Sequence, residues 1–297
     1  MRNDRLSSMD ASETHLRHAL EDCNNAVEEL QGKKESPELL GAYARRASVL
    51  AMMGYRTSAL DDIESAKELS ETMGEPEPSV MFRIYVTEAI LLYEQDTDPI
   101  ESYYNASAYL SKVNEDDAFY DQRSLLNACI TAISDLLNYG HAEDTGPFIE
   151  KAYGLCMSFN NPWIMNRKLE VCNLDGEVCE EMGVLPGAID AYGRAVQLGM
   201  ELLSMGSLED EEELVSALIS KGNCEQEDED PASALTDFRS AALIMEQMLD
   251  NHRLDDIEIL SDVYRNIASI LISQGREEEG ETYLIKSMKS ELRMNDS

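Results

Sequence analysis

The chain has 297 residues, 43% of them hydrophobic, and its 59 acidic and 24 basic side chains give a formal net charge of −35. This share of apolar residues is enough for a packed core, so the composition excludes wholesale disorder. The negative charge excludes a general nucleic-acid binder and a protein drawn to anionic membranes, because both need clustered Lys and Arg.

Further features of the sequence narrow the class of protein. No stretch reaches the roughly 18 apolar residues that a membrane span requires, and the first residues are polar instead of forming an apolar signal core. Six scattered cysteines without a CxxC pair indicate reduced core residues. We therefore expect a cytoplasmic protein that does not bind membranes.

Helices are the predicted secondary structure throughout, since only 8 prolines and 16 glycines interrupt the chain. Residues 1–35 predict a single opening helix. Residues 36–76 predict the first helix pair, with Gly54 at its turn. The apolar positions of these elements are Leu16, Ala19, Cys23 and Ala26, then Tyr43, Ala47, Leu50, Ala59, Ile63 and Ala66.

The next two predicted pairs, 77–115 and 116–160, are less regular. Thr97-Asp-Pro marks the turn of the first and Gly140 the turn of the second. Their apolar positions are Ile84, Leu91, Ile100 and Tyr104, then Cys129, Leu136, Ile149 and Ala152.

The clearest pair is 161–207. Gly176 stands where two helices would cross closely, because a larger substituent would push their axes apart. Gly183 suits the left-handed end of the first helix, and Pro186 suits the first turn of the second. Tyr192 and Ala195 place a large side chain beside a small one on one face.

Two more pairs follow in 208–253 and 254–297. Asp230-Pro231 predicts the cap and first turn of a helix. The matching positions are Gly222, Ala234, Phe238 and Ala241, then Tyr264, Ala268, Leu271, Gly275, Gly280, Leu284 and Ser287.

This pattern resembles the tetratricopeptide repeat (TPR), whose two antiparallel helices carry small residues at fixed places. The markers Ala19, Ala59, Ile100, Thr145, Ala188, Ala234 and Gly280 recur every 40 to 46 residues, whereas about 34 is usual for the family. The resemblance implies an all-α fold: a right-handed superhelical solenoid of antiparallel helix pairs, with about 13 helices. It also implies a concave surface lined by the first helix of each pair.

Reading the inward positions of those first helices predicts a partner-binding groove. Its residues run from apolar and aromatic to acidic: Met52, Phe82, Tyr85, Tyr93, Asn127, Asn138, Asn173, Glu177, Glu180, Glu181 and Asn223. We expect a protein or peptide partner, basic and with an apolar anchor. The alternatives are that the aromatic residues belong to the core, and that the acidity serves solubility or life at high salt.

Some TPR co-chaperones hold a C-terminal carboxylate with a clamp of Lys and Asn. Asn223 matches one clamp asparagine here, but Ile219 stands at the companion basic position and the other sites are not basic. We therefore do not expect that clamp.

The sequence predicts neither an enzyme nor a metal or cofactor site. None of His15, His18, His141 and His252 stands in a catalytic motif, and there is no Gly-rich phosphate loop. A non-enzymatic scaffold or adaptor is the expected function. The alternatives are a peptide-sensing regulator and a self-associating assembly factor, in which Tyr283, Leu284, Met288 and Leu292 of the last helix would form a homodimer.

Overall fold

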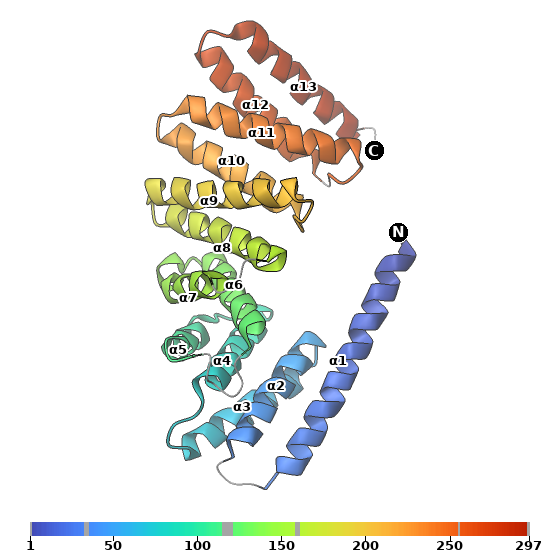
Figure 1. The fold of residues 1–297 in the computed structure, drawn as a ribbon, viewed down its shortest axis with the longest axis vertical. Helices are drawn as coiled ribbons and strands as arrows, with labels where there is room; N and C mark the ends of the chain where they lie inside the picture. Colours follow the sequence, from blue (N-terminus) through green and yellow to red (C-terminus); the bar gives the residue numbers. More distant parts are fainter. Residues whose placement is uncertain (1, 33–35, 115–120, 158–160, 255, 296–297) are drawn as a thin grey trace. The chain divides into compact units, whose positions relative to one another are not determined.

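The protein is built from α-helices. The computed structural model describes residues 2–32, 36–114, 121–157, 161–254 and 256–295, with side chains between 14 and 292. These residues form thirteen α-helices and one 3-10 helix, and no strand occurs among them (Figure 1). The prediction of an all-α fold with about 13 helices is confirmed.

The chain divides into two compact units, residues 1–155 and 156–297. The first contains α1 (Arg2–Leu30), α2 (Pro37–Met52), α3 (Arg56–Thr72), α4 (Pro78–Tyr93), α5 (Ile100–Leu110), α6 (Gln122–Asn138), the 3-10 helix η1 (Ala142–Asp144) and most of α7 (Gly146–Met157). The second contains α8 (Pro162–Glu181), α9 (Leu185–Ser204), α10 (Glu211–Glu227), α11 (Pro231–Asp250), α12 (Ile257–Ser273) and α13 (Glu277–Asn295).

Consecutive helices within each unit pack as pairs. In the first unit α2 lies against α3 and α4 against α5, and in the second α8 lies against α9, α10 against α11 and α12 against α13. Each pair then contacts the next one: α2 packs on α4 and α9 packs on α10. This stacking buries apolar clusters in both units, among them one around Leu40, Ile63 and Ile84 in the first and one around Phe238 and Ile267 in the second.

The turns that follow many of the helices, within pairs and between them, share one backbone conformation. Gly183 has a φ of +69°, and the N–H of Val184 donates to the carbonyl of Cys179 at 2.7 Å, which closes the end of α8. Gly54, Gly140, Gly206 and Gly275 have the same left-handed conformation at the ends of α2, α6, α9 and α12. Asp96, Glu229 and His252 adopt it without being glycine, with φ of 52°, 62° and 55°.

Helix starts are fixed by side-chain caps, as the sequence predicts for Asp230. Its carboxylate accepts the N–H of Ser233 at 3.2 Å, and Pro231 follows in the first turn of α11. In the second unit α8, α10 and α12 are capped in the same way, by Asn161, Asp210 and Asp256. These caps satisfy backbone N–H groups that a helix leaves unpaired at its start.

Two glycines in first helices allow an aromatic ring of the second helix to lie directly on the backbone. A Cβ added to Gly176 would stand 2.5 Å from the ring of Tyr192, and one added to Gly222 would stand 3.0 Å from the ring of Phe238. Gly199 of α9 is equally close to its neighbour, because its Cβ would lie 2.7 Å from Leu214 of α10. Glycine therefore sets the spacing both within a pair and between pairs.

None of the described helices combines the length and apolar character needed to cross a lipid bilayer.

We expect Gly176→Ala to lower the free energy of unfolding by about 1–3 kcal/mol, because the new methyl overlaps the Tyr192 ring in a packed core. Gly193→Ala is the matched control. It lies in α9, and its new Cβ would stand 3.7 Å from Lys221, so the better helix propensity of alanine should raise stability by about 0.5–1 kcal/mol. Urea unfolding followed by circular dichroism measures both, and equal effects of the two changes would contradict the close crossing.

Candidate functional site

A cavity of about 380 Å³ opens between the helices α2, α4 and α6 of the first unit. We call it the α4 groove, because α4 forms its floor and α2 and α6 supply its sides. Its lining comprises Ser48, Ala51 and Met52; Ser79, Phe82, Arg83, Val86, Thr87, Ile90 and Glu94; Val113; and Asp121, Ser124, Leu125, Asn127, Ala128 and Thr131.

The helical period explains how α4 serves both the core and the groove. Ser79, Arg83, Val86 and Ile90 follow at steps of four, three and four residues, so they share one face of the helix. Ile84, on the other side of α4, is fully buried in the core of the unit. Because α4 is apolar on nearly all sides, the groove has an apolar floor.

The polar groups of the α4 groove are mostly hydroxyls. The Oγ atom of Ser48 lies 3.1 Å from Oγ1 of Thr87, so this pair links α2 to α4. Asp121 is engaged at the start of α6, where it accepts the N–H of Arg123 and the hydroxyl of Ser124. The groove can therefore bind apolar side chains and hydrogen-bond a backbone.

Three of the six residues predicted in the first unit meet in this groove: Met52, Phe82 and Asn127. Met52 is 67% exposed, whereas Phe82 is buried in the groove floor. The structure thus brings together predicted positions from α2, α4 and α6.

The other three predicted residues of this unit are not among the lining of the groove. Tyr85 packs on the core, stacks on Tyr109 of α5 at 5.9 Å and lies under the Lys67 ammonium. Tyr93 meets the ring of Tyr139 edge-on at 5.4 Å, and Asn138 is exposed at the end of α6. Tyr85 therefore belongs to the core, as the alternative interpretation of the aromatic residues had it, and does not line the groove.

A second candidate surface lies on α8 and the start of α10, in the second unit. Asn166, Glu170, Asn173 and Glu177 share one face of α8, again at steps of four, three and four residues. Together with Glu180 of α8 and Glu213 of α10 these glutamates form what we call the α8 acidic face.

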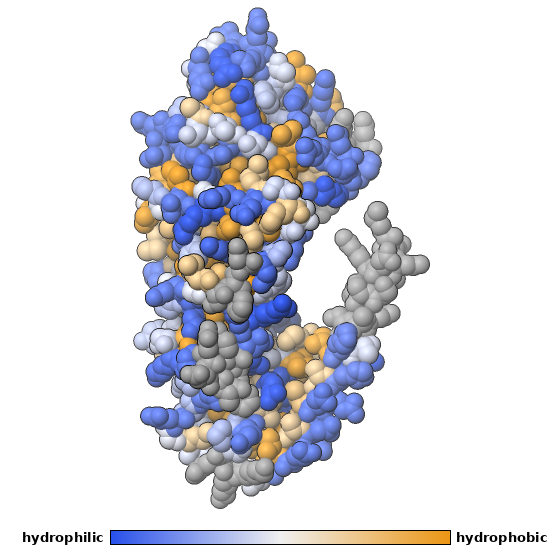
Figure 2. Space-filling model, in the orientation of Figure 1, coloured by the Kyte–Doolittle hydropathy of each residue, from blue (hydrophilic) through white to orange (hydrophobic). Residues whose placement is uncertain are grey.

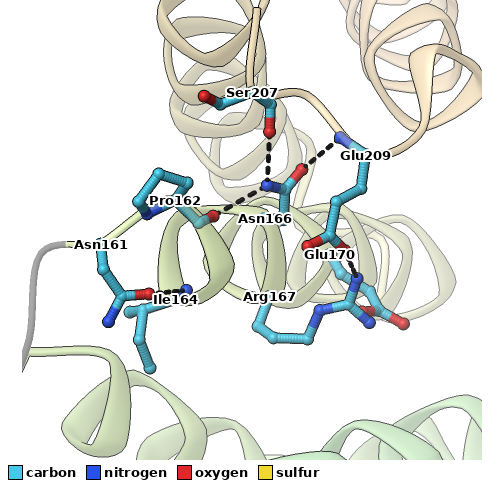
Figure 3. Close-up of polar contacts among 8 residues, drawn as sticks. All are labelled: Asn161, Pro162, Ile164, Asn166, Arg167, Glu170, Ser207 and Glu209. Atoms are coloured by element: carbon cyan, nitrogen blue, oxygen red, sulfur yellow. Dashed lines mark hydrogen bonds and ion pairs between the residues drawn. The ribbon is translucent and has the colours of Figure 1, made fainter. Parts of the chain in front are cut away.

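Hydrogen bonds to the α9–α10 connection position this face, as Figure 3 shows for its N-terminal part. Asn166 donates to the carbonyls of Pro162 and Ser207 at 2.8 and 3.0 Å and accepts the N–H of Glu209 at 2.9 Å. Further along α8, Asn173 donates to the carbonyl and the carboxylate of Glu213 at 3.0 and 2.7 Å. Asn173 is therefore a buried tie between α8 and α10.

The α8 acidic face carries more negative charges than nearby cations compensate. Partial burial of its carboxyl, and then Glu213 and Glu180, raise the pKa of Glu177 above its usual range, although much of the side chain is exposed. Burial also raises the pKa of Glu170, although Arg167 lies 2.9 Å away and opposes the shift. A cation arriving here would relieve repulsion that the folded chain already bears.

Of the residues predicted here, Glu177, Glu180, Glu181 and Asn223 are exposed and Asn173 is buried. Glu180 has a structural contact as well, because its carboxylate accepts the hydroxyl of Tyr192. Sequence reasoning missed Glu213, which lies in the acidic first turn of α10, and Arg83, whose place in the apolar period of α4 was a usable signal.

Two further groups lie outside these surfaces. In the connection before α7, the ligand atoms of His141, Glu143 and Asp144 lie within 4.8 Å of one another, a cluster that the sequence did not predict.

On α13, Met288 and Leu292 are 61% and 64% exposed, as the homodimer hypothesis requires. Tyr283 and Leu284 are half-buried, and Tyr283 packs on the core of the unit, so pairing through α13 stays a prediction.

No protein-family model matches the sequence, and no curated protein matches it. Solved structures do resemble it. The apo form of RapI is 12% identical with a TM-score of 0.60 over 93% of this chain and 74% of that one. Aspartyl phosphate phosphatase F from Bacillus subtilis is 13% identical with a TM-score of 0.54, over 95% of this chain and 72% of that one.

A signal transduction ATPase with numerous domains from Pyrococcus horikoshii, described as having a tetratricopeptide repeat sensor, is 11% identical with a TM-score of 0.58. The match covers 97% of this chain and 41% of that one, so the chain spans less than half of that protein. At these identities the likeness concerns the fold, which is of the tetratricopeptide type.

We expect Glu177→Gln to raise the free energy of unfolding near pH 7 by a few tenths of a kcal/mol, since it removes a charge from a crowded, solvent-screened face. The folded pKa of Glu177 lies above its usual 4.5, so the native state is penalised above the folded pKa. Below about pH 4.5 the carboxyl is protonated in both states, and the gain should vanish.

Urea unfolding at pH 7 and pH 4 measures this difference. Glu181→Gln, which removes the same charge from an exposed neighbour, is the control. A gain that persists unchanged at pH 4, or that Glu181→Gln reproduces, would contradict the proposed repulsion.

Proposed function

We propose that this chain is a non-enzymatic binding scaffold, whose first helices hold a segment of a partner protein or a peptide. The observation that carries the proposal is the α4 groove, a cavity of about 380 Å³ that three first helices build together and that contains Met52, Phe82 and Asn127. A groove of this volume with an apolar floor and scattered hydroxyls suits side chains of an extended segment.

Burial of apolar side chains is the proposed source of affinity in the α4 groove. Phe82, Val86 and Ile90 stand along its floor, and the exposed side chain of Met52 can adapt its shape to an incoming residue. Figure 2 shows a mainly hydrophilic surface on which apolar side chains gather in separate patches.

Basic side chains are the proposed ligands of the α8 acidic face in the second unit. Glu177 is exposed and lies near Glu213 and Glu180, so a Lys or Arg of the partner gains attraction and removes repulsion at once. The net charge of −35 adds a long-range field that draws basic segments and that salt weakens.

A peptide-sensing regulator is a narrower form of the same proposal. The matched structure from Pyrococcus horikoshii carries a tetratricopeptide repeat described as a sensor. For this reason we retain the peptide-sensing regulator as an alternative. The experiments below address the shared step, the binding of a segment.

Filling the α4 groove should abolish binding of apolar peptides. The probe is a pool of N-acetylated, C-amidated peptides that have Leu, Ile, Val, Phe or Met at random positions and carry Gly-Ser tails. We expect Ala128→Trp to reduce the amount of these peptides that the chain retains by at least about tenfold. The physical reason is that the indole ring occupies the cavity that Ala128 lines. Immobilised full-length chain and mass spectrometry of the eluted peptides give the measurement.

Ala232→Trp, at an exposed position of α11, is the matched control and should leave retention unchanged. Equal retention by wild type and Ala128→Trp would place the binding outside the α4 groove.

Neutralising Glu177 of the α8 acidic face together with its exposed neighbour Glu181 should weaken binding of Lys-containing peptides. We expect Glu177→Gln with Glu181→Gln to lower their affinity about threefold to tenfold at low salt and less at high salt, because exposed charges are screened. Glu180 is kept, since it accepts the Tyr192 hydroxyl. Isothermal titration calorimetry at two salt concentrations measures the effect.

Glu101→Gln with Glu143→Gln removes the same two charges from exposed positions of the first unit and serves as the control. If this control loses as much affinity, the net charge and not the α8 acidic face governs binding.

A further inference from the structure

Arg83 gives the α4 groove a positive group in a strongly acidic chain. Among the residues described as lining the groove it is the only cation, whereas the lining acids are Asp121 and Glu94. Arg83 lies on the floor helix α4 and is half-buried. A basic partner would be expected to meet negative charge in its binding site, whereas Arg83 presents a positive charge here.

The guanidinium of Arg83 has no hydrogen bond and no ion pair within the described part of the chain, although burial makes such contacts valuable. Arg46 shows the contrast: its guanidinium holds Asp62 with two bonds of 2.6 and 2.7 Å. The chain has 59 acidic side chains against 24 basic ones, so a half-buried arginine that none of the described carboxylates bonds stands out.

The two acids of the groove are engaged elsewhere. Asp121 accepts the N–H of Arg123 and the hydroxyl of Ser124, at 3.2 and 2.5 Å, and so caps α6. Glu94 pairs with Arg56 at 3.0 Å. Asp121 still attracts Arg83 through space, but neither carboxylate closes the guanidinium off from a ligand.

Burial lowers the pKa of Arg83, and the neighbouring charge of Arg45 acts in the same direction. Arginine nevertheless stays protonated in proteins. The group is therefore a cation that has lost part of its hydration, and an incoming anion can compensate for that loss.

We propose that the α4 groove binds a segment in which an aspartate or glutamate side chain stands between apolar residues, with its carboxylate paired to Arg83. The inference rests on the proposed function and specifies the ligand of the same groove. The groove lining continues on both sides of Arg83, with Ser79 one turn before it and Val86 and Ile90 after it. A chain can therefore pass the guanidinium in both directions, which suits an internal side chain better than a chain end.

The partner then has mixed charge. Its segment in the α4 groove is apolar and locally acidic, whereas the residues proposed for the α8 acidic face are basic. Planar, bidentate pairing of arginine with a carboxylate would fix the position of the acidic residue along α4. Discrimination of this kind also keeps a uniformly basic segment out of the groove.

The test compares three peptide pools on the immobilised full-length chain. Each pool is N-acetylated and C-amidated, carries Gly-Ser tails and has two random apolar residues on either side of a central Glu, Gln or Lys. We expect wild type to enrich the Glu pool about tenfold over the Gln pool, and Arg83→Gln to remove that preference. Arg83→Lys should keep part of it, and Arg123→Gln, at an exposed position at the start of α6, should keep all of it.

Thermal unfolding of each variant shows whether it folds. If Arg83→Gln does not fold, Arg83→Lys still tests the inference, because its preference for the Glu pool can be compared with that of wild type. Equal retention of the Glu and Gln pools by wild type overturns the inference; if Ala128→Trp still abolishes retention of both, the proposed function stands without it. Retention that is absent, or indifferent to Ala128→Trp, overturns both.

A fourth pool, with central Gln and a free C-terminal carboxylate, separates the two sources of a carboxylate. If it matches the Glu pool and loses its advantage in Arg83→Gln, the commitment to a side chain is overturned. If it behaves as the amidated Gln pool does, the side-chain assignment is supported.

Discussion

Close approach of helices at glycine is the constraint on which the arrangement of the second unit depends. At Gly176 the ring of Tyr192 lies where a Cβ would be, and at Gly222 the ring of Phe238 does the same. An aromatic side chain supplies the buried area that holds the pair together, and glycine supplies the space for it. The candidate binding surfaces of both units lie on exposed faces of first helices.

The two surfaces show how one architecture can hold opposite chemistry. In the first unit α4 is apolar on nearly all sides, so its exposed face forms a groove with a single arginine among the described lining. In the second unit the corresponding face of α8 carries Glu170 and Glu177, and asparagines fix it to the next pair. Burial and the acidic arrangement raise the pKa values of Glu170 and Glu177, and so they cost stability, a common trade at binding sites.

Much of the fold followed from the sequence, because Gly183, Asp230-Pro231 and the paired small and large residues each have one local meaning. The site followed less well. Phe82 and Asn127 were placed in the groove from the helical period, but Tyr85 packs on Tyr109, because a few positions along a helix decide between core and surface. Arg83 was missed because its lack of a bonded carboxylate among the described residues is visible only once its neighbours are known. Asn173 was predicted as a groove residue, but its tie to Glu213 was not, because the two residues are 40 positions apart in the sequence.

The positions that pack the helices together differ from those that face a ligand, and this difference has an evolutionary consequence. Changes at Met52, Ala128 or Glu177 alter what a ligand meets without touching a glycine crossing, whereas a change at Gly176 or Gly222 disturbs the stack and leaves the surface chemistry as it was. Descendants of this chain could therefore exchange partners through substitutions at a small set of positions while the backbone is inherited intact. The repeats would diverge fastest where they face a ligand, and the glycine–aromatic pairs would be the last trace of common ancestry.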